Sequence, residues 1–130
     1  MPRKNLFICF EVWSDFGYLP FLTGLFRALK TPRPYDLTQI MVETYNNAVI
    51  HAHRLQRKKW IGIEILLTPK WGRIRVRDEG GGIPAKFFKK ISGRWQTSGR
   101  GLALIQAKAD RVSSRRRGRH HIFEMICLYE

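Results

Sequence analysis

Several features are scarce in this 130-residue sequence, and each scarcity argues against a class of protein. No apolar run approaches the roughly 20 residues that a membrane-spanning helix needs. The apolar beginning, residues 6–10, is soon interrupted by Glu11 and lacks the small-residue cleavage site of a signal peptide. We therefore expect a cytoplasmic protein that does not enter a membrane.

Cysteine is rare too, since only Cys9 and Cys127 are present, near opposite ends of the chain. Both lie in apolar, strand-like runs, and their separation does not match the spacing of metal-binding cysteines. In a cytoplasmic protein, two buried free thiols are favoured over a disulfide. The sequence thus predicts no disulfide framework and no cysteine-based metal site.

Acidic residues are few: 10 Asp and Glu stand against 24 Lys and Arg, a formal net charge of +14. Such a balance favours a polyanionic partner, which could be nucleic acid, a nucleotide or an acidic protein, and it is also compatible with a solubility trait. With 44% hydrophobic and 26% charged residues, the chain otherwise resembles a soluble globular protein. Its length suits one domain, residues 1–130, with one core.

Glycine and proline are absent between Asp36 and Trp60, which predicts a long helix there. Apolar residues recur near the three-to-four spacing of a helix, and Asp36 is the candidate N-cap. Glu43 and Asn47, four residues apart, would share one helix face. Glu43 could act as a base and Asn47 as a neutral oxygen ligand, or the two could be a polar pair on a solvated face.

The rest of the chain alternates strand and helix signals. Strands are predicted at 5–13, 60–68, 73–77 and 122–129 with a further extended segment from Val112, and helices at 16–29, 84–91 and 101–109. Residues 113–119 are expected to form a very basic turn, either solvated or a docking surface. This order of elements predicts an α+β fold, a two-layer sandwich in which helices pack on one face of a mixed β-sheet.

A glycine-rich motif, Asp78-x-Gly80-x-Gly82, directly follows the third of these strands. An ionised aspartate only accepts hydrogen bonds, so Asp78 could bind the amino group of adenine but not the oxygen that guanine carries instead. Gly80 and Gly82 would let the backbone approach a ligand closely. Without other evidence, an acidic glycine-rich turn is an equally good interpretation.

A second motif, Gly99-Arg100-Gly101, opens the predicted helix at 101–109. Free N–H groups and the positive end of the dipole at a helix start can hold phosphate groups. Many helices simply begin after a glycine, so this motif is weak evidence by itself. The motif becomes informative because it follows the Glu43 helix and the Asp78 motif in the chain, and three motifs in a fixed order are more specific than one.

The three motifs in this order resemble the ATP-binding domain of the GHKL superfamily, which includes gyrase-type topoisomerases, histidine kinases and MutL-type repair proteins. Within that superfamily, the sequence is most similar to the bacterial anti-sigma-factor serine/threonine kinases. The similar stretches are Glu43–His53, Val76–Ile83, Gly99–Ile105 and Ala109–Val112. The resemblance extends from the first strand to the last, and it implies a two-layer sandwich of the Bergerat type.

The resemblance also implies a role for each motif. Glu43 would be the general base, and Asn47 would bind Mg²⁺ through its amide oxygen. The residues implied in ATP binding are Asn47, Asp78, Gly80, Gly82, Ile83, Gly99, Arg100, Gly101 and Leu102. Residues 84–98 would form a short lid over the nucleotide.

One segment departs from the family pattern. The family carries Gly-Thr before its last strand, whereas this chain has Gly118-Arg119-His120-His121 there. A threonine contact to the nucleotide is therefore expected to be missing.

The implied function is that of an ATP-dependent serine/threonine kinase. It would phosphorylate an anti-anti-sigma factor and alternatively hold a sigma factor, and a homodimer is a further expectation because the family often forms dimers. The first alternative is a non-catalytic ATP-binding regulatory module or a histidine-kinase-like ATPase domain. The least favoured is a basic nucleic-acid-binding protein, because the sequence contains no recognition motif of that class.

Overall fold

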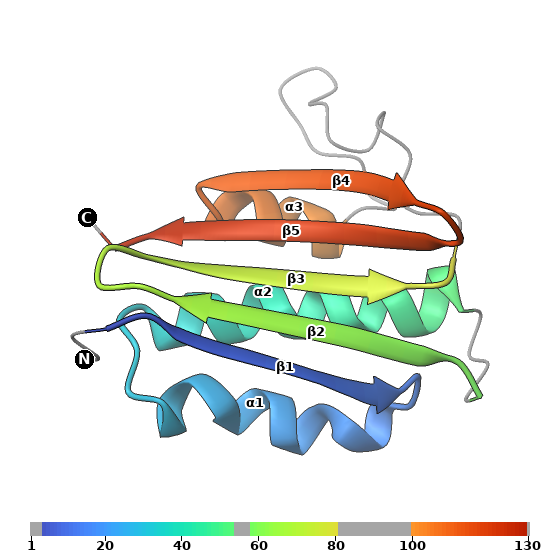
Figure 1. The fold of residues 1–130 in the computed structure, drawn as a ribbon, viewed down its shortest axis with the longest axis horizontal. Coiled ribbons are helices and arrows are strands. Elements are labelled where there is room, and N and C mark those ends of the chain that lie inside the picture. The colour runs from blue at the N-terminus through green and yellow to red at the C-terminus, as the bar shows by residue number, and fades with distance from the viewer. Residues whose placement is uncertain (1–3, 54–57, 81–99, 130) are drawn as a thin grey trace.

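A computed structural model of the chain describes residues 4–53, 58–80 and 100–129 (Figure 1). The strands in this part are β1 (Leu6–Trp13), β2 (Trp60–Leu67), β3 (Trp71–Asp78), β4 (Arg111–Arg117) and β5 (His120–Leu128). The helices are α1 (Leu19–Ala28), α2 (Pro34–Asn47) and α3 (Arg100–Lys108), with a 3₁₀ turn at Phe16–Tyr18 and a π-helical segment, η2, at Ala48–Ala52. In Figure 1, α2 and α3 lie behind the sheet, α1 lies along β1, and no helix of the described residues covers the front face.

The five strands form one sheet in the order β1-β2-β3-β5-β4, and every neighbouring pair is antiparallel. The predicted α+β class is confirmed, but the expectation of a mixed sheet is wrong. A single helix between β1 and β2 would make the two strands parallel. Here two helices, α1 and α2, return the chain to the end where β1 stopped, so Trp60 at the start of β2 pairs with Trp13 at the end of β1.

The core lies between the sheet and the helices, and every second residue of the inner strands enters it. Its fully buried members include Leu22, Phe26, Leu37, Ile40, Met41, Ile61, Ile63, Ile65, Ile74, Val76, Phe123 and Met125. Because side chains alternate across a strand, the intervening residues all project from the opposite face, which we call the open face.

The long helix predicted from residue 36 differs from the structure at both ends. It begins at Pro34, since proline is tolerated in the first turn, and its N-cap is Arg33 in the left-handed region (φ 52°) rather than Asp36. Regular α-helical winding stops at Asn47 and continues as η2, so the predicted helix changes its pitch part-way. The continuation towards Trp60 falls partly outside the described residues.

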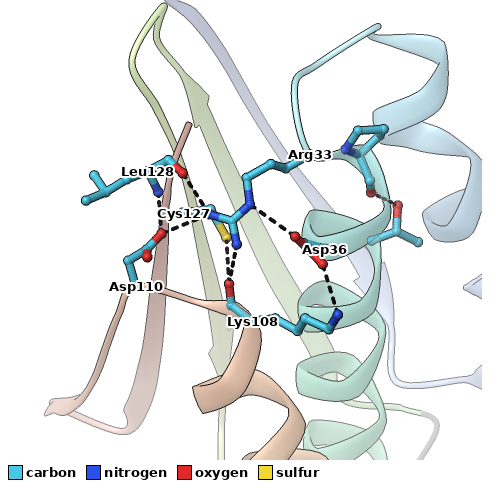
Figure 2. A network of polar contacts seen from close by, with 8 residues as sticks. Arg33, Asp36, Lys108, Asp110, Cys127 and Leu128 are labelled. Carbon is cyan, nitrogen blue, oxygen red and sulfur yellow. Dashed lines mark hydrogen bonds and ion pairs between the residues drawn. The ribbon is translucent and has the colours of Figure 1, made fainter. Parts of the chain in front are cut away.

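Arg33 joins several elements at the end of the sheet where α2 begins (Figure 2). Its Nε donates a hydrogen bond to Asp36 (3.0 Å) and its Nη1 donates to Asp110 (2.9 Å). Its two terminal nitrogens also donate to the main-chain carbonyls of Leu128 and Lys108, each at 2.7 Å. One side chain therefore fastens the start of α2 to the end of α3, to the connection before β4 and to the end of β5.

The basic segment 113–119, expected to be a turn, is mostly strand. β4 pairs with β5 as far as Arg117 opposite His120, and the turn itself is confined to Gly118 and Arg119. Gly118 has φ 64°, a conformation that favours glycine. β5 is a well-buried strand, and its backbone supplies the hydrogen-bonding partners of β4. β4 therefore continues as a strand to Arg117 although its own sequence there is too polar to predict one.

Both cysteines are free, but only Cys127 is buried as expected. Cys9 is exposed because it occupies an outward position of β1. Burial raises the pKa of the Cys127 thiol to about 11. Among the described helices, none has the length and apolar character needed to cross a membrane.

Candidate functional site

Asp78 ends β3 with its side chain on the helix-facing side of the sheet, where the residue is only 6% exposed. Its Oδ1 accepts a hydrogen bond from the N–H of Gly80 (2.8 Å), so the glycine motif folds back over the carboxylate. Its Oδ2 lies 3.7 Å from Nδ1 of His121, beyond hydrogen-bond distance. Asp78 therefore has a fixed orientation and one oxygen that could accept a hydrogen bond from a ligand.

The segment η2 brings the end of α2 against the end of β3. His53, which follows η2 and is 1% exposed, accepts on Nε2 a hydrogen bond from the N–H of Glu79 (2.9 Å). The sequence favours packing or capping over metal binding as the role of His53, because His51 and His53, two residues apart on a helix, would point in different directions. The hydrogen bond between His53 and Glu79 is a contact of the packing or capping kind. The bond ties the helix that carries Glu43 to the strand end that carries Asp78.

Glu43 and Asn47 lie on the flank of α2 that faces α3. Glu43 and Asn47 follow Asp36 by 7 and 11 residues, which is close to two and three full turns of a helix with about 3.6 residues per turn. The three side chains therefore project in nearly the same direction from the helix axis. Asp36 contacts Lys108 of α3, with Oδ1 3.3 Å from Nζ. Glu43 and Asn47 are both half-buried, so they share one face, as predicted, at the boundary between the two helices.

α3 packs against α2 and runs antiparallel to it. Its last residue, Lys108, lies beside Asp36 in the first turn of α2, so its N-terminal end is directed towards Glu43. The nine residues of α3, at about 1.5 Å each, cover a length similar to that from Asp36 to Glu43. Main-chain N–H groups and the positive end of the α3 dipole therefore lie at the same end of the molecule as Glu43 and Asn47.

The predicted site residues divide into three groups. The structure describes Glu43, Asn47, Asp78 and Gly80, and it brings the elements that carry them together at one end of the sheet. Arg100, Gly101 and Leu102 are described only as the backbone of the first turn of α3. Gly82, Ile83, Gly99, the lid predicted at 84–98 and the short helix predicted at 84–91 lie outside the described residues.

Three side chains that were not predicted as site residues also gather around Asp78. His121 pairs with Asp78 in the β3–β5 register, is 4% exposed and contacts Ser114 Oγ through its Nε2. Arg116 Nη1 donates to the carbonyl of Gly80 (3.4 Å). The alternation of the last strand could have revealed His121, because every second residue from it onward is buried.

Acidification should destabilise this site through His53. Burial lowers the pKa of His53 below its ordinary value, against the weaker opposing effect of the Asp78 charge. The unfolded chain therefore binds more protons at this residue, so the stabilisation is complete above about pH 6.5 and is lost as the pH falls. His53→Gln keeps an acceptor for Glu79, and we expect its free energy of unfolding to decline less than that of wild type between pH 7.5 and 5.5. Urea unfolding measures both declines, and equal declines would contradict the prediction.

Comparison with known proteins identifies the family. The sequence profile described as histidine kinase-like ATPase domain matches residues 25–127, which include every candidate site residue. No curated protein shows significant similarity to the chain. The chain belongs to the histidine kinase-like ATPase domain family, so it is an ATP-binding module, and the GHKL resemblance is confirmed at that level.

The described residues fit an adenine nucleotide and a magnesium ion. Nδ1 of His121 is buried and has no hydrogen-bond partner among them, and it lies beside the available Oδ2 of Asp78. An amide oxygen such as that of Asn47 suits Mg²⁺, which prefers oxygen ligands. No cluster of three His, Cys, Asp or Glu side chains in this part of the chain could hold a metal.

Proposed function

We propose that this protein is a serine/threonine kinase of the anti-sigma type, which transfers the γ-phosphate of Mg-ATP to a hydroxyl group of a partner protein. The observation that carries the proposal is the position of Glu43. It lies on the flank of α2 that faces α3, at the end of the molecule where Asp78 ends β3. A carboxylate in that position can reach a hydroxyl presented at the phosphate end of a nucleotide whose base is held by Asp78.

Each residue would have a separate task in the reaction. Asp78 would accept a hydrogen bond from the adenine amino group, and Asn47 would bind Mg²⁺ through its amide oxygen. The N-terminal N–H groups of α3 would hold phosphate oxygens. Glu43 would orient the attacking hydroxyl and accept its proton, while Mg-ATP supplies the phosphoryl group and leaves as Mg-ADP.

The partners proposed for this kinase follow from the family resemblance. The phosphorylated protein would be an anti-anti-sigma factor, and a sigma factor would be the protein held alternatively. A homodimer and a cytoplasmic location belong to the same proposal.

Thermal unfolding of wild type and Asp78→Asn tests the nucleotide site. Mg-ATP or Mg-ADP at 100 times its Kd should stabilise wild type by about 2.7 kcal/mol and raise Tm by several degrees, whereas Mg-GTP should not. Asp78→Asn should lose the shift, because its amide presents a donor to the adenine amine. As the control, Glu11→Gln removes a carboxylate from the open face and should keep the shift. No shift in wild type at millimolar nucleotide would contradict this site.

Phosphate transfer from radiolabelled ATP to candidate serine-containing partners then separates the kinase from its alternatives. Labelling of a partner supports the proposed activity. Release of phosphate without any labelled protein would indicate a histidine-kinase-like ATPase. Binding without either reaction would indicate a non-catalytic regulatory module.

A further inference from the structure

The open face of the sheet is rich in arginine. It is the face turned towards the viewer in Figure 1, and no described helix covers it. Its outward positions carry six arginines, Arg73, Arg75, Arg77, Arg111, Arg115 and Arg117, and three glutamates, Glu11, Glu64 and Glu124. These nine residues therefore give the open face a net charge of +3, which is part of the net charge of +14 of the whole chain.

Two of these arginines make all the ion pairs that the described residues form on this face. Arg75 pairs with Glu124 and, at 3.6 Å between Nη1 and Oε2, with Glu64. Arg77 Nη2 pairs with Glu11 Oε1 at 2.6 Å. The other four arginines have no ion-pair partner among the described residues. Most of that uncompensated charge belongs to β4.

A hollow of about 390 Å³ lies on the open face, at the same end of the sheet as Asp78. Its cationic lining comes from Arg75, Arg77, Arg115 and Arg117. Gly62 leaves room for the guanidinium of Arg77, because a Cβ at this position would lie 3.0 Å from its Nη2. Guanidinium groups around a concave surface are suited to phosphate oxygens, which they can bind with two parallel hydrogen bonds.

Exposed aromatic rings adjoin the hollow. Trp13 and Trp60 stack across β1 and β2 with their ring centroids 3.5 Å apart, and they are 38% and 41% exposed. The next outward residues on their strands, Glu11 and Gly62, line the hollow itself. Aromatic rings on which bases stack, beside a positively charged groove, are the two components of a surface for single-stranded nucleic acid.

We propose that the open face binds single-stranded nucleic acid, with phosphate groups on Arg115 and Arg117 and bases stacked on Trp13 and Trp60. A second copy of this chain would set one arginine-rich face against another, which like charges oppose. An acidic peptide would use the arginines but would leave the tryptophans without a role. The inference does not rest on the proposed kinase activity, because the ATP site lies on the other side of the sheet.

Fluorescence anisotropy with labelled 12-nucleotide oligothymidylate and oligouridylate tests the proposal and compares DNA with RNA. Arg115→Gln/Arg117→Gln should weaken binding about 20-fold and reduce the salt slope by about 1.4, since each phosphate contact on a single strand contributes about 0.7. Trp13→Leu should weaken binding about tenfold without changing the slope. The control Arg27→Gln/Lys70→Gln removes the same charge from α1 and the β2–β3 turn, and should change affinity by less than about twofold.

Cys9 gives an independent measurement in the same proteins. It is exposed and lines the hollow, whereas Cys127 is buried and the pKa of its thiol is raised to about 11. Iodoacetamide should therefore alkylate Cys9 first. Saturating oligonucleotide should slow this alkylation severalfold, as followed by mass spectrometry, while excess Mg-ATP should not.

Three results would overturn the proposal. Equal weakening by both double variants would indicate attraction by net charge rather than a site. Polyglutamate that binds as tightly as the oligonucleotides, with no effect of Trp13→Leu, would assign the face to an acidic protein. If neither oligonucleotide binds at 50 mM salt, the open face does not bind single-stranded nucleic acid.

Discussion

Glu43→Gln should transfer phosphate about a hundredfold to ten-thousandfold more slowly than wild type, the usual contribution of a general base. Glutamine keeps the size and polarity of the side chain but cannot accept a proton from the attacking hydroxyl. Because Asp78 and Asn47 are unchanged, the affinity for Mg-ATP should stay close to that of wild type. Single-turnover transfer measures the rate, and the nucleotide-dependent shift in Tm measures binding.

Glu11→Gln is the matched control for Glu43→Gln, because it removes a glutamate carboxylate from the opposite face of the sheet. It should retain the wild-type transfer rate. Unchanged transfer by Glu43→Gln would exclude Glu43 as the base. Loss of nucleotide binding together with transfer would instead give Glu43 a structural role.

Arg33→Ala should lower the free energy of unfolding by about 3 kcal/mol and Tm by about 10 °C. Burial by itself would lower the pKa of Arg33, but its hydrogen bonds to Asp36 and Asp110 outweigh that effect and raise it. The guanidinium therefore stays charged wherever the protein is folded. Its removal leaves two carboxylates and the carbonyls of Lys108 and Leu128 without this donor.

Two further substitutions separate the side chain of Arg33 from its backbone. Arg33→Gly also removes the guanidinium but accepts φ 52° without strain, so it should be about 1 kcal/mol more stable than Arg33→Ala. Arg33→Lys keeps the charge but not the planar fork, and should fall between wild type and Arg33→Ala. Urea unfolding gives all three values, and an Arg33→Ala variant as stable as wild type would refute the structural role of this network.

The sequence predicted the parts of the fold that depend on local pattern. The strand ending at Trp13 and the one starting at Trp60 are correct because apolar alternation continues through both. The antiparallel sheet was not predictable in the same way, since it depends on how two helices return the chain. The extended segment predicted from Val112 is the start of β4, but the continuation of this strand to Arg117 was missed, because Arg115–Arg117 carries no apolar signal and becomes a strand only through pairing with β5.

In the candidate site too, some features follow from local sequence pattern and others depend on the tertiary structure. Glu43 and Asn47 could be recognised because helical spacing places them on one face. The contact between His53 and Glu79 joins residues 26 positions apart in the chain, and the proximity of His121 to Asp78 depends on the β3–β5 register. Neither relation has a local sequence signal, so both required the structure.

The position of β4 has a consequence for solubility. Among the described residues β4 is an edge strand that pairs only with β5, so another chain could pair with its outer row of N–H and C=O groups and extend the sheet. An antiparallel pairing of two copies centred on Arg116 would bring six positive charges together, because each edge carries arginine at positions 115, 116 and 117. These arginines thereby protect the edge from aggregation, and concentrated solutions of Arg115→Gln/Arg117→Gln should scatter more light over time than solutions of wild type.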